Sequence, residues 1–405
     1  GEDFGFEIPE EPESRLEVHG NLDGKWGLLQ TRKGSSLYGL RFYGAQDESD
    51  YLSQYRLDFY LNGEYRLKQV GFFARTSTQY VRDEPIQTSF FELYGSLNLS
   101  PKLTVGLGKR RYNWGRGYAF NPVGYVNAEK DPENPDLALA GQASAYLVYN
   151  RSYSSGWVQN FSFTGVALPP APDLLERYAA ASHTGAALKL YFLVRDIDVD
   201  LMAFRQKGEA PKYGLGLSTN LRPNLEIHGE FSYVWAETKP VVQDDLVAHR
   251  QVSGASYLLG TRYLTERGTT VIAEYYHTPF GLSRSEYRDA VDFLQRRIDS
   301  GDPALLREAG SVISEVFRTR TVMQDYLYLK VTQPEPFGWL YTSVSVFTIY
   351  NLEDRSFILS PLVAYKPYTN FEFLVWPTLF RGSTETELRS RQFRRKIEVW
   401  TRFYF

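Results

Sequence analysis

The chain has 405 residues, with 45 Lys and Arg against 48 Asp and Glu, and the resulting net charge of −3 argues against a general nucleic-acid-binding protein. It contains no Cys, which excludes disulfides, Cys-ligated metal centres and covalent attachment of haem to this chain. The mean hydropathy is −0.38 and no run of about 18 apolar residues occurs, so helical membrane spans are excluded, although 16% of the residues are aromatic.

Residues 1–10 lack the charged and then apolar pattern of a signal peptide. We therefore expect the numbering to describe a mature chain, with any targeting peptide already removed. The composition leaves one membrane architecture open, because a strand of an antiparallel barrel in lipid needs an apolar residue only at every second position.

Apolar and polar residues alternate along most of the chain, as where Leu57 and Phe59 flank Asp58 and where Phe91 and Leu93 flank Glu92. Such alternation predicts strands with one apolar and one wet face. Strands of about 9–14 residues, longer than those of most globular sheets, are predicted at 15–30, 52–62, 67–80, 86–99, 102–112, 142–152, 157–168, 184–195, 197–206, 212–221, 224–236, 250–264, 269–278, 322–332, 339–350, 356–365, 370–380 and 395–405.

The predicted connections alternate between short and long. Tight turns include 62–64, 100–101 and 195–196, and the longer loops are 31–51, 113–141, 169–183, 237–249, 279–321 and 381–394. This pattern predicts an all-β fold in a single domain, residues 1–405: a transmembrane antiparallel up-and-down β-barrel with long extracellular loops. We expect about 18 strands, within 16–20, because segment 37–45 fits a further strand, a bent continuation or an inward-folded piece.

Aromatic residues gather near the predicted strand ends. Rings with a polar tip favour the headgroup zone of a bilayer, so we expect these rings at the membrane interface. They are Tyr275, Tyr276, Trp339, Tyr341, Trp376, Phe380 and Trp400.

Segment 108–141 is the most distinctive part of the chain. It leaves a strand through three bases at 109–111, and its 29-residue connection, 113–141, has no strand of its own, which is more often functional than idle. The distinctive residues are Trp114, Gly115, Gly117, Asn121, Pro122, Lys130, Asp131 and Pro132. Three interpretations stay open: an inward fold whose bases form a charged constriction, a docking surface for a partner, or a brace for the wall. We favour the inward fold or the docking surface slightly over the brace.

Loop 279–321 is predicted to contain helices. Ser283 and Glu286 have the spacing of a capping box, and the apolar stripe that follows is Tyr287, Ala290, Val291, Leu294 and Ile298. Gly301 ends this helix, and Asp302-Pro303 begins another. The stripe favours a lid on the chain's own barrel over a partner surface. A second short helix is predicted at 173–181.

The predicted wet faces carry side chains of both charges. Candidates for the pore lining or its constriction are Arg56, Asp58, Glu92, Arg110, Arg116, Lys189, Glu230, Arg262, Glu274 and Arg402. Mixed charges set a field across a lumen without a strong ion preference. The five His residues lack metal-ligand spacing and no G-x-S-x-G motif occurs. We therefore predict no enzyme, no catalytic residues and no metal site.

The chain ends in Phe405, with Phe403 on the same face of the last strand. The strand pattern and the terminal Phe resemble those of bacterial outer-membrane β-barrel proteins over nearly the whole chain. The resemblance implies that Phe403 and Phe405 form a signal for the barrel assembly machinery. It also implies an integral protein of the bacterial outer membrane, surrounded by lipid and lipopolysaccharide. An even strand number places both termini in the periplasm, with 1–14 as a periplasmic segment.

A narrower resemblance rests on the run Trp114-Gly115-x-Gly117-Tyr118-x-Phe120-Asn121-Pro122-Val123 and on Lys130-Asp131-Pro132. The run is similar to the porin-like barrels of porin–cytochrome conduits in metal-reducing bacteria, in which the barrel insulates multihaem cytochromes. The resemblance implies no cofactor on this chain, with haem on cytochrome partners.

Two functions therefore stand level: a sheath for cytochromes in extracellular electron transfer, and a porin-like solute channel. An inward loop 113–141 favours the channel, and an outward loop favours docking of a partner. A polysaccharide-export or substrate-specific channel is an alternative, and a barrel enzyme is less favoured.

Overall fold

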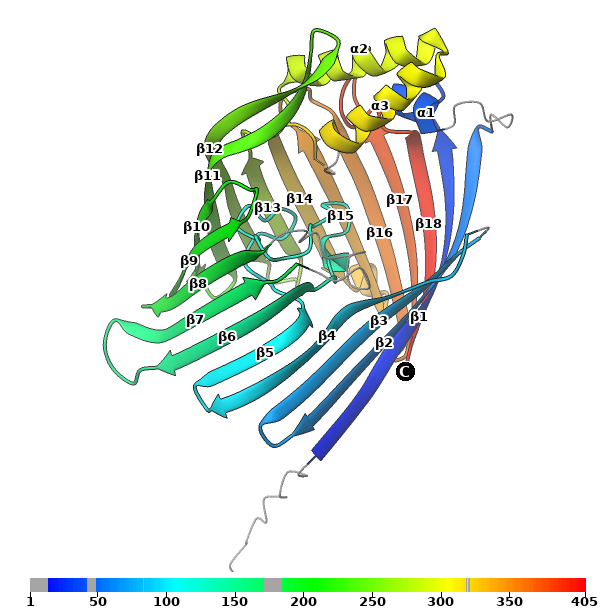
Figure 1. The fold of residues 1–405 in the computed structure, drawn as a ribbon. Coiled ribbons are helices and arrows are strands. Elements are labelled where there is room, and N and C mark those ends of the chain that lie inside the picture. The colour runs from blue at the N-terminus through cyan, green and yellow to red at the C-terminus, as the bar shows by residue number, and fades with distance from the viewer. Residues whose placement is uncertain (1–13, 42–48, 83, 171–183, 318, 320) are drawn as a thin grey trace, which may run out of the picture.

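The computed structural model describes residues 14–41, 49–82, 84–170, 184–317, 319 and 321–405. They form a closed antiparallel sheet of 18 strands, in which each strand pairs with its neighbours in sequence and β1 also pairs with β18 (Figure 1). The strands are β1 (Ser14–Thr31), β2 (Tyr51–Leu67), β3 (Val70–Val81), β4 (Gln87–Ser100), β5 (Leu103–Arg110), β6 (Gln142–Ser152), β7 (Val158–Leu168), β8 (Gly185–Val194), β9 (Ile197–Gln206), β10 (Lys212–Arg222), β11 (Leu225–Gln243), β12 (Leu246–Leu264), β13 (Thr270–His277), β14 (Asp325–Pro334), β15 (Thr342–Asn351), β16 (Phe357–Tyr368), β17 (Phe371–Arg381) and β18 (Phe393–Tyr404).

The predicted antiparallel barrel of about 18 strands is confirmed. Its closure is seen at β1, where Asp23 lies opposite Asp58 of β2 on one side and Arg402 of β18 on the other. The backbone groups of β1 thus have partners in both neighbouring strands, and the sheet has no free edge.

The wall has an apolar outer face and a polar inner face. On β2, Leu57 and Phe59 are 48% and 37% exposed, whereas Asp58 and Tyr60 between them are buried. The same alternation places exposed Ile227 and Phe231 beside buried His228 and Glu230 on β11. An outer surface of this kind requires an apolar surrounding medium, because a water-soluble protein rarely exposes so large an apolar area. Among the described residues no helix has the length and apolar character to cross a membrane.

Helices cover one rim of the barrel, which we call the helix rim; the opposite rim, which has the tight turns, is the turn rim (Figure 1). The helices are α1 (Ser36–Arg41), α2 (Arg284–Ser300) and α3 (Pro303–Val316), with 3-10 turns η1 (Pro135–Leu137) inside the barrel and η3 (Pro336–Gly338) at the turn rim. The capping box of Ser283 and Glu286 and the left-handed Gly301 at the end of α2 are confirmed.

The apolar stripe of α2 packs on the chain itself. Tyr287, Phe293 and Leu294 are fully buried and belong to one core with Tyr326 of β14 and Leu388 of the β17–β18 loop. The stripe therefore serves as a lid contact. In segment 37–45, residues 36–41 form α1 rather than a strand and 42–48 lie outside the described residues, as does the predicted helix 173–181.

Two predicted connections are wrong. Residues 62–64 lie inside β2, which continues to Leu67 and turns at Lys68, a residue with φ 47°. Segment 237–249 is a long β11–β12 hairpin rather than a loop, with a turn at Asp244 and Asp245. Positive φ at both turn residues matches the twist of paired strands, so the ladder extends beyond the barrel wall.

Some predicted orientations are also wrong. The β3–β4 register shifts between Arg75 and Thr76, so that Phe91 is skipped in the pairing and contacts Tyr60 inside the barrel. Trp376, Phe380 and Trp400 are 3–7% exposed in the interior core rather than at the membrane interface. Each occupies the inward position of its strand, so its ring packs in the barrel interior instead of facing lipid.

Candidate functional site

The connection between β5 and β6, residues 111–141, enters the interior of the barrel, and we call it the lumen loop (Figure 1). Its residues contact side chains of β9, β11, β13, β14 and β18. Of the three interpretations of this segment, the structure shows the inward fold. The same contacts also brace the wall. The lumen loop therefore occupies part of the barrel interior.

Two buried carboxylates hold the first part of the loop. Glu230 on β11 accepts hydrogen bonds from the backbone N–H groups of Arg116 and Gly117, the latter at 2.7 Å. Glu274 on β13 accepts from the N–H groups of Tyr118 and Ala119, the latter at 2.9 Å. Both carboxylates are at most 3% exposed. A carboxylate that accepts two backbone hydrogen bonds fixes a loop more strongly than neutral contacts do.

Polar contacts within the loop maintain its bend. The Trp114 backbone N–H donates to Asn127 Oδ1 at 2.9 Å, and the Trp114 carbonyl accepts from the amide groups of Asn121 and Asn127. Gly115 has φ 90°, a left-handed conformation that favours glycine. The Lys130 ammonium donates to the Gly117 carbonyl. Burial lowers the pKa of Lys130, while the carboxylates of Glu230, Glu274 and Asp136 oppose this shift.

Apolar side chains seat the same segment on the wall. Phe120 stacks on Tyr276 of β13 with ring centroids 4.8 Å apart. Trp114, Val123 and Val126 are buried in a second cluster with Tyr146 of β6. Burial of a large side chain stabilises by about 1.5–3 kcal/mol, so these contacts hold the loop against the wall together with the carboxylates.

The loop also makes ion pairs with the wall on either side of β5 and β6. The Glu133 carboxylate pairs with the Arg391 guanidinium and, at 3.4 Å, with the Lys396 ammonium of β18. Arg116 pairs with Asp198 at 3.3 Å on β9. The lumen loop thus leaves β5 and makes ionic contacts with strands on two separate parts of the wall.

The space left around the loop forms two cavities. One, of about 800 Å³, lies between residues 119–132 and β10–β13 and extends to the end of α3. The other, of about 590 Å³, lies between Glu133, the inner faces of β1 and β18, and the lid helices. The two cavities therefore lie on different sides of the loop, one toward β10–β13 and the other toward β1 and β18.

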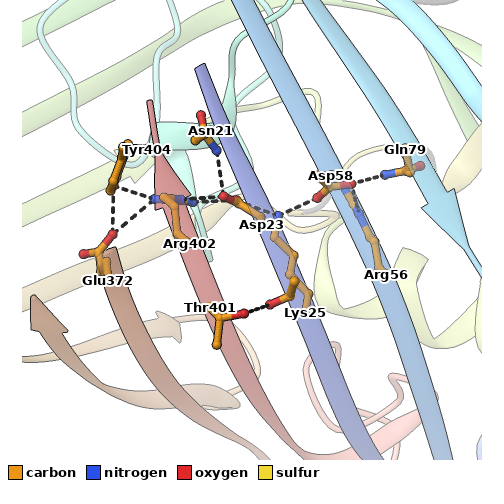
Figure 2. A network of polar contacts seen from close by, with 11 residues as sticks. Asn21, Asp23, Lys25, Arg56, Asp58, Gln79, Glu372, Thr401, Arg402 and Tyr404 are labelled. Atoms are coloured by element: carbon orange, nitrogen blue, oxygen red, sulfur yellow. Dashed lines mark hydrogen bonds and ion pairs between the residues drawn. The ribbon is translucent and has the colours of Figure 1, made fainter. Parts of the chain in front are cut away.

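A polar network lines the inner face of the barrel seam where β1 meets β2 and β18 (Figure 2). Asp23 pairs with Arg402 through oxygens 2.7 and 2.8 Å from its guanidinium nitrogens, and Lys25 donates to Asp58 at 2.6 Å. Arg56 also donates to Asp58 at 2.6 Å. Alternating charges at this density neutralise one another and hold the side chains in place.

The network brings together three of the predicted lining residues, Arg56, Asp58 and Arg402. Lys25 and Asp23 were not predicted, although their two-residue spacing on β1 places them on the wet face with the others. That spacing was the available signal. Arg402 also contacts Glu372 of β17 at 3.5 Å, and Tyr404 donates to the same carboxylate at 2.9 Å.

The other predicted lining residues are distributed around the wall. Glu92 accepts the Arg111 N–H at 2.9 Å and pairs with Arg75 at 3.5 Å. Lys189 pairs at 3.0 Å with Asp200, and Arg110 lies 4.1 Å from the centroid of the Tyr146 ring. The remaining candidate, Arg262, is exposed on β12 opposite Glu226.

Glu230 and Glu274 form a clamp rather than a pore lining, because both are buried under the lumen loop. The distant partners Glu133, Arg391 and Lys396 were also missed. Glu133 lies more than 250 residues before its two basic partners in the chain, so no local pattern relates it to them. Pro122, Asp131 and Pro132 stay within the loop, where Asp131 accepts the Glu133 N–H at 3.0 Å.

The C-terminal aromatic residues complete the seam on the outer face. Phe403 and Phe405 are about half exposed, and Phe405 stacks on Phe59 with centroids 5.9 Å apart. Its backbone N–H donates to Gly20 at 3.1 Å. A Cβ at Gly20 would clash with the Tyr60 backbone carbonyl and lie 2.6 Å from the Phe405 ring, so a larger residue would have to displace the backbone of β2.

Replacing Glu230 with alanine is expected to destabilise the folded barrel by about 1–3 kcal/mol, because the N–H groups of Arg116 and Gly117 lose their buried acceptor. Urea unfolding from lipid vesicles measures the loss, and hydrogen exchange at the two amides locates it. Glu226→Ala, a more exposed carboxylate on the same strand and face, is the control and should change stability by less than about 0.5 kcal/mol. Equal effects of the two substitutions would contradict the clamp.

No group of three or more His, Asp or Glu residues is placed to hold a metal ion within the described ranges. No family model matches the chain, and no curated protein matches it.

Solved structures do match the fold. OccK8 (OprE) of Pseudomonas aeruginosa has a TM-score of 0.56 and 10% identity, covering 96% of this chain and 98% of that chain. OccK9 (OpdG) of the same organism has a TM-score of 0.56 and 8% identity, with the same coverage. A mutant of the Rhodopseudomonas blastica porin has a TM-score of 0.47 and 10% identity, covering 96% and 100%. The likeness concerns the fold alone, and by fold the chain is a porin-like, closed antiparallel β-barrel.

Proposed function

We propose that this protein forms a polar passage for small hydrophilic solutes across the bacterial outer membrane, and that it is not an enzyme. One observation carries the proposal: the lumen loop crosses the interior from β5 and is held there by Glu230, Glu274 and Glu133. A fixed loop of this kind narrows a barrel without filling it, which suits passage of small molecules.

The apolar outer face and the fold likeness to OccK8 and OccK9 support an outer-membrane location. We further propose that the helix rim is extracellular and that both termini are periplasmic, because barrels of this class have their longer loops outside. Lipid and lipopolysaccharide are then the surrounding partners, and the barrel assembly machinery would read Phe403 and Phe405.

The channel is favoured over the cytochrome sheath. A sheath needs a lumen wide enough for a second folded chain, and the lumen loop takes up that width between β5 and β18. A polysaccharide-export channel is less favoured too, because the bases of the seam are paired with acids rather than arranged as a continuous basic surface.

Recordings from single barrels in planar lipid bilayers test the proposal. We expect discrete conductance steps in potassium chloride and a reversal potential near zero under a salt gradient, because the lining mixes both charges. Absence of conductance at every voltage would overturn the channel. Co-purification of a haem-absorbing partner with the barrel would favour the sheath instead.

A further inference from the structure

A basic pocket lies at the helix rim, where β1, β17 and β18 end beside α1 and α2 (Figure 1). Its volume is about 650 Å³. Five basic side chains line it, namely Arg32, Lys33, Arg381, Arg389 and Arg394, against the acidic Asp292 and Glu385, which leaves a net charge of +3. We call it the arginine pocket. It is separate from the lumen loop and from the two cavities beside it.

Among the described residues, the four arginines of the pocket have no carboxylate as an ion-pair partner. Lys33 pairs with Asp50 at 3.0 Å, but within the described part of the chain none of the four guanidinium groups forms an ion pair with a carboxylate. Arg32 Nη2 and Arg389 Nη1 donate to the backbone carbonyls of Phe380 and Gly382, at 3.3 and 3.0 Å. These contacts orient the guanidinium groups without cancelling their charge.

Arg32 has the feature that most favours a bound anion. Its Nη1 atom is buried and has no hydrogen-bond partner among the described residues. Burial and the nearby charges of Arg389, Arg394 and Arg381 lower the pKa of Arg32 to about 10. A buried donor without an acceptor beside like charges is unfavourable, and an anion with several oxygens would satisfy both defects.

The pocket is built on fixed backbone. The Arg32 N–H donates to the Gln392 carbonyl at 2.8 Å. The Leu388 N–H donates to Ser356 Oγ at 3.2 Å, and the Glu387 carboxylate accepts from the Val322 N–H at 2.8 Å in the core under the lid. The loop that carries Arg389 is thereby anchored, so little ordering is needed when a ligand binds.

The pocket lies at the edge of the apolar outer face. Arg381 follows Leu379 on the outward side of β17, next to exposed Leu359 of β16. The register shift between Gln30 and Thr31 leaves Arg394 without an opposite residue on β1. Arg394 is therefore skipped in the pairing of β1 with β18. The end of an apolar belt is the level at which lipid headgroups lie.

We propose that the arginine pocket binds a phosphate group, presented by a phosphorylated lipid headgroup such as that of lipid A. Several planar guanidinium groups line one pocket. They match a phosphate, which offers several oxygens as acceptors, better than a halide, which has no oxygen, or a carboxylate, which has two. Free inorganic phosphate has the same chemistry and is the alternative source. The proposal rests on the proposed outer-membrane location with an extracellular helix rim, but it does not depend on whether the barrel conducts.

Binding to the full-length barrel in detergent tests the site. The probes are lipid A, lipid A stripped of its phosphates, and inorganic phosphate, measured by native mass spectrometry and by calorimetry. The test variant is Arg32→Gln with Arg394→Gln, and the matched control is Arg222→Gln with Arg267→Gln, two exposed arginines at the turn rim. Heat-shifted migration in gels shows whether each variant forms a closed barrel.

We expect wild type and the control to bind lipid A alike, and the test variant to bind about a hundredfold more weakly, since one charge-assisted contact is equivalent to about a tenfold change in affinity. Arg32→Lys keeps the positive charge but loses the planar set of N–H donors of the guanidinium group. Its affinity for lipid A should fall to a smaller extent than that of the test variant. Inorganic phosphate binding as tightly as lipid A would support the phosphate site and assign it to the free anion. Equal binding of stripped lipid A, or unchanged affinity in the test variant, would overturn the proposal.

Discussion

Deleting residues 116–138 is expected to raise the single-channel conductance several-fold. This segment holds the contacts to Glu230, Glu274, Arg391 and Lys396, so its removal would merge the spaces on either side of the loop. Current through a pore follows its narrowest section, and a barrel of 18 strands is wide enough for an aqueous channel when its interior is clear. Recordings in planar bilayers measure the change.

The deletion must leave the wall intact for this comparison. Heat-shifted migration and a β-sheet circular dichroism spectrum check that the barrel has closed. Arg267→Gln at the turn rim changes one charge far from the loop and should leave conductance unchanged. A deletion barrel with the conductance of wild type would refute the constriction and would place the narrowest section at the lid helices.

Leu57→Arg is expected to destabilise the barrel in lipid by about 2–4 kcal/mol if the residue lies near the bilayer midplane, because an outward arginine there loses its hydration. Leu57 is 48% exposed on the outer face of β2. The matched control is Gln54→Arg, three residues earlier on the same strand, which faces the interior cavity beside Glu133. Urea titration from phosphatidylcholine vesicles measures both.

The two arginines lie on the same strand, three residues apart, and differ in the face that carries them. Gln54→Arg should cost less than about 1 kcal/mol, since its side chain lies in a wet interior with a carboxylate close by. Similar losses at both positions would show that the inner and outer faces of β2 have been assigned wrongly.

Local pattern predicted most of the wall. The two-residue alternation placed Leu57 outward and Asp58 inward without reference to other strands, because a strand directs successive side chains to opposite faces. The same pattern failed at Phe91, where a bulge inserts a residue into β4. A bulge is decided by pairing with the neighbouring strand, which a single segment does not contain.

Interior aromatics show a second limit. Trp376 and Trp400 were expected at the membrane interface, yet they are buried in the barrel interior with ring centroids 5.5 Å apart. Composition says that a ring has an apolar body and a polar tip, and both the interface and a covered lumen satisfy that requirement. The face of the wall that carries the ring decides between them, and β17 and β18 direct both rings into the interior.

The sequence by itself determined an antiparallel barrel of about 18 strands, most of its inner and outer faces and the caps of α2, because these features depend mainly on residues within one strand, turn or helix. The tertiary structure alone decided the path of the lumen loop, the clamp of Glu230 and Glu274, and the meeting of four arginines from 32 to 394. The physical reason is that these features join segments far apart in the chain, and only closure of the sheet brings those segments together.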